Sequence, residues 1–255
     1  MSFSEIASRG IQHIYAIDHE VQEHYIRITC EQVRHMKPDI VYEMEGFFVP
    51  NNDYMKHMFG EAILDPAYDC YDTFGNCKWD NLLVIPIFGV FGDIVGFVGF
   101  DPFNKLRTQD PQYWSLRVYK NSSKILLDKE VHLFGKKGLY RRAFEEGYII
   151  LTDGVFDTVH ASAYGLNAGA LLGSSVSPQL IAILTLVDKV YLAMDNDEAG
   201  LRLYQDLKKH LKNLRCIRNR NGKDLDDLLH TNKVDKFLKL FNENLQSDIT
   251  LDIYI

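Results

Sequence analysis

The spacing of hydrophobic and polar positions becomes regular from Gly147 onward. Short apolar runs, which are typical of buried strands, alternate there with amphipathic stretches of helical spacing. Such alternation with short connections favours a parallel α/β sheet with helices on both faces. Strands are expected at 148–151, 168–172, 190–194 and 215–217, and helices at 155–164, 178–187, 198–211 and 225–229.

The chain before Gly147 is less regular and predicts a different kind of fold. Apolar runs at 82–88 and 94–100, joined by a turn, predict an antiparallel hairpin. Further short strands are possible at 118–122 and 131–134, whereas residues 1–80 show only patchy helical spacing. A mixed α+β portion is therefore expected to precede the α/β sheet, and a short helical end is expected at 234–241.

Carboxylates follow two of the expected parallel strands. Asp153 and Asp157 come after 148–151, and Asp195 and Asp197 come after 190–194. Parallel α/β sheets bind ligands outside the carboxyl ends of their strands, so these side chains are expected to converge. Clustered carboxylates repel one another unless cations neutralise them, and oxygen ligands suit hard divalent ions. The alternative for Asp197 is that it only caps the following helix.

Charge is distributed unevenly along the chain. The net charge of −7 argues against a protein that coats nucleic acid by bulk charge. Residues 104–142 nevertheless hold ten basic and three acidic residues, and residues 208–223 hold seven basic residues and no acid. Two basic stretches on either side of an acidic centre suit a site that handles phosphates, although a basic run can also be a solvated face.

Several classes of protein do not fit the sequence. No apolar run is long enough to span a membrane, and the N-terminus lacks the pattern of a signal peptide, so a cytoplasmic location is expected. The four cysteines form no C-x-x-C pair, which indicates free thiols and no zinc in this chain. His160 is expected to be an ordinary helix residue.

Short motifs occur in a fixed order over residues 80–230. Ile85-Pro-Ile87, Gly92-x3-Gly96-Phe97, Tyr119-Lys-Asn121-Ser122, Lys129, Leu133-Phe-Gly135, Asp153-Gly154, Asp195-Asn-Asp197 and Gly222-Lys-Asp224 follow one another. In this order they resemble the TOPRIM-containing polymerase core of bacterial and phage replicative DNA primases (DnaG type). The resemblance implies a TOPRIM domain with a mostly parallel four-stranded sheet flanked by helices. The expected boundaries are an α+β primase-core subdomain at 1–142, the TOPRIM domain at 143–221 and a short helical segment at 222–255.

The resemblance also implies an activity and roles for individual residues. The family consists of metal-dependent nucleotidyltransferases that make short RNA primers on single-stranded DNA from ribonucleoside triphosphates, and a phage replication setting is expected, with the host cytoplasm as the location. Mg²⁺ or Mn²⁺ would be the cofactor. The implied catalytic residues are Asp153, Asp195 and Asp197; the implied metal ligands are these three and Asp157; the implied nucleotide or template contacts are Asn121, Lys129, Lys223 and Asp224.

The sequence also departs from the family pattern. Asp153 stands where the family has glutamate, and Leu82, Phe100 and Val118 stand where it has basic residues. No zinc-binding module and no helicase-binding domain are expected in this chain. A replicative helicase or a separate zinc-binding protein is therefore expected as a partner. No association with a membrane is expected. The alternatives are a catalytically degenerate primase-like binding protein of the replisome or of transcription, and a TOPRIM nuclease.

Overall fold

The protein is represented by a computed structural model, which divides the chain into two compact units, Met1–Asp128 and Lys129–Ile255. The predicted nucleotide or template contacts Asn121, Lys129 and Lys223 lie outside the residues that the structure describes. The predicted boundaries at 142 and 221 stay predictions. The described residues are 47–48, 83–92, 94–100, 117–119, 131–173, 175–193, 195, 197–219, 224–230, 233–247 and 252–254.

In the first unit, the described strands form one antiparallel sheet in the order β1-β2-β3-β4. The predicted hairpin is confirmed, because β2 and β3 pair antiparallel with Ile85 opposite Val98. The turn between them closes through a hydrogen bond from Gly92 N to Gly89 O at 3.0 Å, and Gly92 has a φ of 81° that favours glycine. The bounds are Phe47–Phe48 (β1), Leu83–Phe88 (β2), Ile94–Phe100 (β3) and Arg117–Tyr119 (β4).

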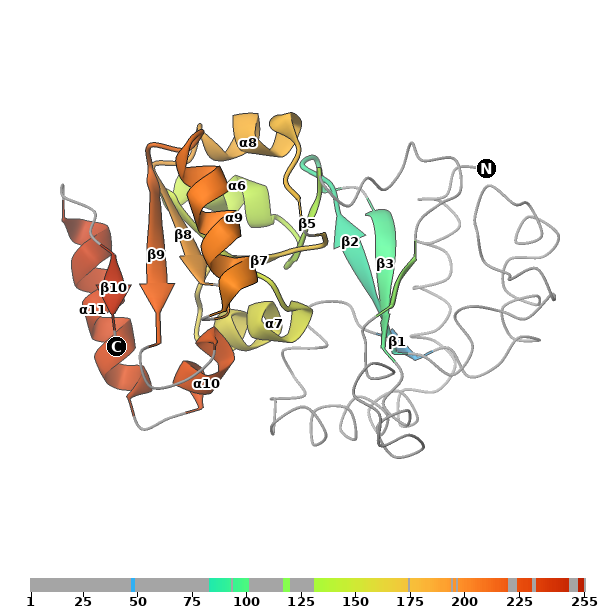
Figure 1. Ribbon diagram of the computed structural model, residues 1–255. Coiled ribbons are helices and arrows are strands. Elements are labelled where there is room, and N and C mark those ends of the chain that lie inside the picture. The colour runs from blue at the N-terminus through green and yellow to red at the C-terminus, as the bar shows by residue number, and fades with distance from the viewer. Residues whose placement is uncertain are drawn as a thin grey trace, which may run out of the picture. The chain divides into compact units, whose positions relative to one another are not determined.

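The second unit contains a six-stranded sheet in the order β10-β9-β8-β6-β7-β5 (Figure 1). The four predicted parallel strands are present as its centre, because β9, β8, β6 and β7 pair parallel. The sheet is wider than expected: β5 adds antiparallel to β7, and β10 adds parallel to β9. The strands are Leu133–Gly135 (β5), Tyr148–Thr152 (β6), Ala168–Leu171 (β7), Lys189–Ala193 (β8), Leu214–Arg218 (β9) and Ile253–Tyr254 (β10).

Helices begin and end where the sequence places capping residues. The Ser177 hydroxyl accepts from Leu180 N at 3.2 Å before Pro178, and Gly165, with a φ of 77°, follows the end of α7. The helix α6, which the sequence pattern did not predict, precedes β6. The helices are Leu139–Glu145 (α6), Val155–Ala163 (α7), Pro178–Leu184 (α8), Glu198–Lys208 (α9), Leu225–Leu229 (α10) and Val234–Gln246 (α11).

The central strands are buried on both faces. All five residues of β6 are buried, and α9 crosses in front of the sheet in Figure 1. On the other face, Tyr148 and Tyr191 belong to a core cluster that also contains Phe237 and Phe241 of α11. The Phe241 ring lies 5.3 Å from that of Tyr148 and 5.0 Å from that of Tyr191. Helix α11 is therefore packed into the same core as the parallel strands.

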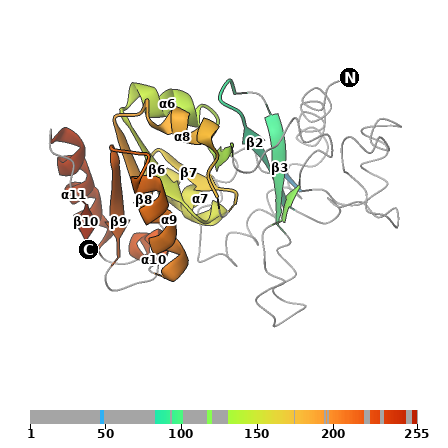
Figure 2. The same cartoon turned by 45° about the horizontal axis from the view of Figure 1, so that its top comes forward.

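The ends of the sheet position the acidic residues. The carboxyl ends of β8 and β9 point toward the region of α7 and α10, as Figures 1 and 2 show.

Among the described helices, none is long and apolar enough to cross a membrane.

Candidate active site

Asp153 and Asp195 leave the sheet from neighbouring strand ends. Strands β6 and β8 pair parallel with Thr152 opposite Ala193, and the two aspartates follow one and two residues later. Asp153 is exposed and Asp195 is partly buried. The expectation that the parallel topology brings these two strand ends together is therefore confirmed.

The turn between β6 and α7 is held by two buried hydroxyl groups. Thr152 Oγ1 lies 2.7 Å from Thr158 Oγ1 and donates to Gly154 O at 3.0 Å. Gly154 caps α7, and a Cβ atom at this position would overlap Oδ2 of Asp157. The Asp157 carboxylate can therefore lie against the start of its own helix only because residue 154 has no side chain.

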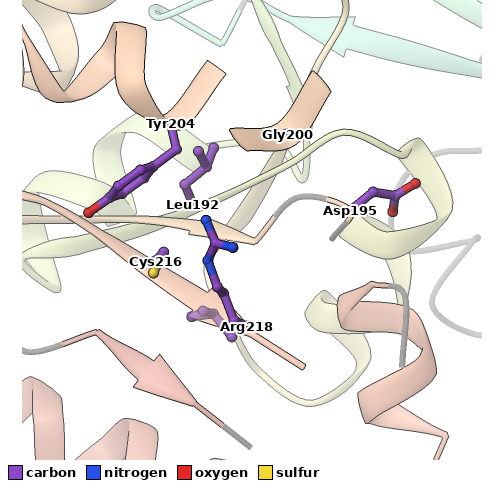
Figure 3. Close-up of a pocket in the computed structure, with 7 residues that line it drawn as sticks. Leu192, Asp195, Gly200, Tyr204, Cys216 and Arg218 are labelled. Atoms are coloured by element: carbon purple, nitrogen blue, oxygen red, sulfur yellow. The ribbon is translucent and has the colours of Figure 1, made fainter. Parts of the chain in front are cut away.

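Asp197 caps helix α9, as the alternative interpretation of this residue required. Its Oδ1 accepts a hydrogen bond from Gly200 N at 2.8 Å. Such capping orders the carboxylate at the start of the helix. Asp195 precedes this helix in the chain and lines a small hollow with Gly200, Tyr204 and Arg218 (Figure 3). The Arg218 guanidinium is 6.0 Å from the centre of the Tyr204 ring.

A third pair of acids approaches from helix α10. Asp224 caps this helix, because its Oδ1 accepts from Asp227 N at 2.6 Å. Carboxylate oxygens of Asp157, Asp224 and Asp226 all lie within 4.8 Å of one another. We call Asp153, Asp157, Asp195, Asp197, Asp224 and Asp226 together the acidic edge.

The structure adds information on two members of the acidic edge. Asp224 was expected to contact nucleotide or template, and the structure places it beside Asp157, a predicted metal ligand. Asp226 was not predicted at all. A signal for it existed, because Asp224 and Asp226 repeat the two-residue spacing of Asp195 and Asp197.

The acidic edge is electrostatically strained. Although Asp153 keeps an exposed surface, the surrounding protein removes part of the water around its carboxylate; this desolvation, followed by the charge of Asp195, raises the pKa of Asp153 to about 6. Burial, followed by the charges of Asp153, Asp226 and Asp224, raises the pKa of Asp157 to about 8. Such shifts arise when carboxylates share a site, and a bound divalent cation would relieve the repulsion. A ligand set that consists of oxygen atoms alone suits Mg²⁺ or Mn²⁺.

His160 lies directly behind the acidic edge. The residue is 5% exposed, and its Nδ1–H donates to Oδ1 of Asp226. His160 lies in helix α7, as expected, and the structure adds a buried contact with Asp226 that the sequence analysis did not predict. Sequence spacing could not reveal this contact, because 66 residues separate the two partners.

Comparison with known proteins agrees with this architecture. Residues 150–229 match the model of the Toprim-like family. The DNA primase of Rickettsia prowazekii is 28% identical over 216 residues, which cover 78% of this chain and 35% of that protein. The DNA primase of Clostridium acetobutylicum is 25% identical over 169 residues, which cover 64% of this chain and 27% of that protein. The chain spans about a third of the length of these curated relatives.

Solved structures show the same fold over most of the chain. The Aquifex aeolicus primase, in a structure of its zinc-binding and RNA polymerase domains, superposes with a TM-score of 0.74 and 19% identity, covering 94% of this chain and 60% of that one. The DnaG catalytic core gives a TM-score of 0.74 and 18% identity, covering 95% of this chain and 79% of that one. By sequence and by fold, the chain therefore contains a Toprim-like domain within a fold of the DnaG primase catalytic core, as its motif order predicts.

Proposed function

We propose that the chain is a primase core, which makes short RNA primers on single-stranded DNA by divalent-metal-dependent nucleotidyl transfer. The observation that carries the proposal is the acidic edge, where carboxylates from β6, β8 and α10 meet and raise the pKa values of Asp153 and Asp157. The matched relatives named above are DNA primases, and a DnaG catalytic domain bound to single-stranded DNA shares the fold with a TM-score of 0.70.

The chain's own residues would have distinct roles. Asp153, Asp157, Asp195 and Asp197 would hold Mg²⁺ or Mn²⁺, and the cation would supply positive charge to nucleotide phosphates. Asp224 and Asp226 would extend this ligand set. As an alternative role, the Asp153 carboxylate would accept the proton of a primer 3′-hydroxyl, as its position in the motif implies.

Polar and basic side chains would bind the phosphates of nucleotide and template. Among the described residues, we assign this role to Arg218, because it lines the same hollow as Asp195. We propose the same role for Asn121, Lys129 and Lys223, because they occupy positions in the motifs that resemble the primase family. A phage replication setting, a helicase partner, a separate zinc-binding partner and a cytoplasmic location also remain proposals.

One observation favours a second candidate function. Asp153 is one methylene group shorter than the glutamate of the family pattern, so its carboxylate reaches about 1.5 Å less far. A primase-like protein that binds nucleic acid or replication proteins without catalysis would tolerate this change. A TOPRIM nuclease would need the same acids as a primase.

A primer-synthesis assay separates these functions. The wild-type chain, Asp195→Asn and the control Asp206→Asn would be incubated with labelled ribonucleotides, single-stranded templates and Mg²⁺ or Mn²⁺. Asp206 is an exposed residue of α9 that pairs with Lys209, so its loss should leave activity unchanged. The assay is run with and without the replicative helicase and a zinc-binding partner.

A primase gives labelled primers with the wild type and Asp206→Asn, and none with Asp195→Asn. Shortening of the DNA that depends on Asp195 would instead show a nuclease. Neither product under any condition, from a chain that still binds template, would support the non-catalytic alternative. Undiminished primer synthesis by Asp195→Asn would refute the site assignment.

A further inference from the structure

Two histidines and one aspartate gather between helices α7 and α10. His160 comes from α7, whereas Asp226 and His230 lie four residues apart on one side of α10 and its C-cap. One nitrogen of each histidine and one oxygen of Asp226 all lie within 4.8 Å of one another. The imidazole rings are in edge contact, with 4.4 Å between their centres.

The burial of this cluster is graded. The side chains of His160 and Asp226 are 7% and 12% exposed, so both are largely buried, whereas the His230 side chain is 33% exposed. Burying two polar side chains costs free energy unless they are paired, and His160 and Asp226 satisfy each other. His230 Nε2 lies 3.5 Å from the same Asp226 oxygen and leaves a path to solvent.

The donor set differs in kind from that of the acidic edge. Two imidazole nitrogens and one carboxylate oxygen form the set that first-row transition ions accept. Mg²⁺ prefers oxygen ligands and keeps much of its water, so it has little affinity for such a site. An ion with imidazole affinity would therefore select the cluster even when Mg²⁺ fills the acidic edge.

We propose that His160, Asp226 and His230 form a second metal site, which binds one divalent transition ion such as Co²⁺ or Zn²⁺. The ion enters from the exposed side of His230 and replaces the proton between His160 Nδ1 and Asp226 Oδ1, which is released to solvent. Asp226 connects the two sites, because its carboxylate also lies within 4.8 Å of Asp157 and Asp224 oxygens. An ion bound there ties α7 to α10 and places positive charge directly beside the acidic edge.

Binding of Co²⁺ tests this site without any measurement of activity. The full chain is titrated with Co²⁺ in excess Mg²⁺, and the visible absorption of ligated Co²⁺ is followed. Wild-type protein should saturate at one Co²⁺ per chain. His230→Ala removes a solvent-accessible ligand and should weaken the affinity about tenfold or more. His160→Gln should do the same, and circular dichroism shows whether this buried substitution still folds.

His210→Ala is the matched control. His210 is an exposed histidine just after α9, and its substitution should leave Co²⁺ affinity unchanged. Asp195→Asn should also retain the Co²⁺ signal, which separates this site from the acidic edge and from the outcome of the primer assay. Equal affinity of wild type and His230→Ala would overturn the proposal. So would a signal that Asp195→Asn removes and His230→Ala keeps, or the lack of any saturable Co²⁺ signal in Mg²⁺.

Discussion

The hydroxyl groups of Thr152 and Thr158 lie 2.7 Å apart and are both buried. Thr152 is the last residue of β6, and Thr158 lies one turn into α7. Their hydrogen bond therefore closes the turn that carries Asp153, Gly154 and Asp157. The geometry of one half of the acidic edge depends on this pair.

Thr158→Val should loosen this turn. The substitution keeps the shape of the side chain and removes the hydroxyl that faces Thr152, which should lower the free energy of unfolding by about 1 kcal/mol. Chemical denaturation measures the change. Thr185→Val is the control, because the Thr185 hydroxyl donates to Ala182 O at 2.7 Å in an exposed position. A loss no larger for Thr158→Val than for Thr185→Val would show that the buried pair does not stabilise the turn.

The acidic edge should give the metal-free protein an unusual dependence of stability on pH. Asp157 has an ordinary pKa of 3.8 and a folded-state pKa of about 8, so the folded protein binds its proton more tightly than the unfolded chain. A raised pKa contributes stability that is complete below pH 3.8 and is lost as the pH rises through 8. The raised pKa of Asp153 adds a smaller loss of stability, which is complete near pH 6.

The variant Asp157→Asn tests whether stability falls as the pH rises. In the presence of a chelator, the free energy of unfolding is measured from about pH 5 to about pH 9. The wild type should lose on the order of 2 kcal/mol more than Asp157→Asn over this range. Asp206→Asn is the control with the opposite sign, because Lys209 lowers the pKa of Asp206, whose small contribution is lost only at acidic pH. Parallel pH profiles of wild type and Asp157→Asn would contradict the pKa shift.

Most of the fold was predictable because its elements have strong local signals. The apolar runs of β6 and β8 are flanked by turn or capping residues, and the Ser177-Pro178 pair marks the start of α8. Helix α6 and strand β10 were missed. Helix α6 has only seven residues and follows Gly138, which provides no side-chain cap, so its local signal is weak. Strand β10 has only two residues, which pair with β9 after a long return of the chain.

The candidate site was predictable only in part. Asp153, Asp157, Asp195 and Asp197 follow strands whose parallel order fixes their convergence. The approach of α10 depends on tertiary packing against α7, which no spacing in the sequence encodes. For this reason the contact between Asp226 and His160 appeared only in the structure, although the spacing of Asp224 and Asp226 could have drawn attention to Asp226 itself.

Asp153→Glu should preserve or raise primer synthesis if the chain is a primase. The longer side chain restores the residue of the family pattern, and Asp153 is exposed, so its carboxylate has access to solvent in which to extend. Initial rates of ribonucleotide incorporation measure the effect, with Asp153→Asn as the control that lacks the charge. Asp153→Asn should be inactive. Inactivity of both variants, with wild-type activity intact, would mean that the site is built around the shorter acid.

Phe241→Ala tests whether the C-terminal helix belongs to the same folding unit as the parallel sheet. Phe241 is 0% exposed and contacts the rings of Tyr148 and Tyr191, and Lys189 Nζ donates to Leu245 O at 2.5 Å at the end of the same helix. Truncating a buried phenylalanine leaves a cavity and should cost about 3–5 kcal/mol. Because the sheet shares this core, strands β6 and β8 should lose protection from hydrogen exchange together with α11. Phe144→Ala, at a side chain that is 45% exposed on α6, should cost far less. If Phe241→Ala unfolded α11 while the amides of β6 and β8 kept their full protection, residues 222–255 would be a separate segment, as the sequence-based boundary at 221 predicts.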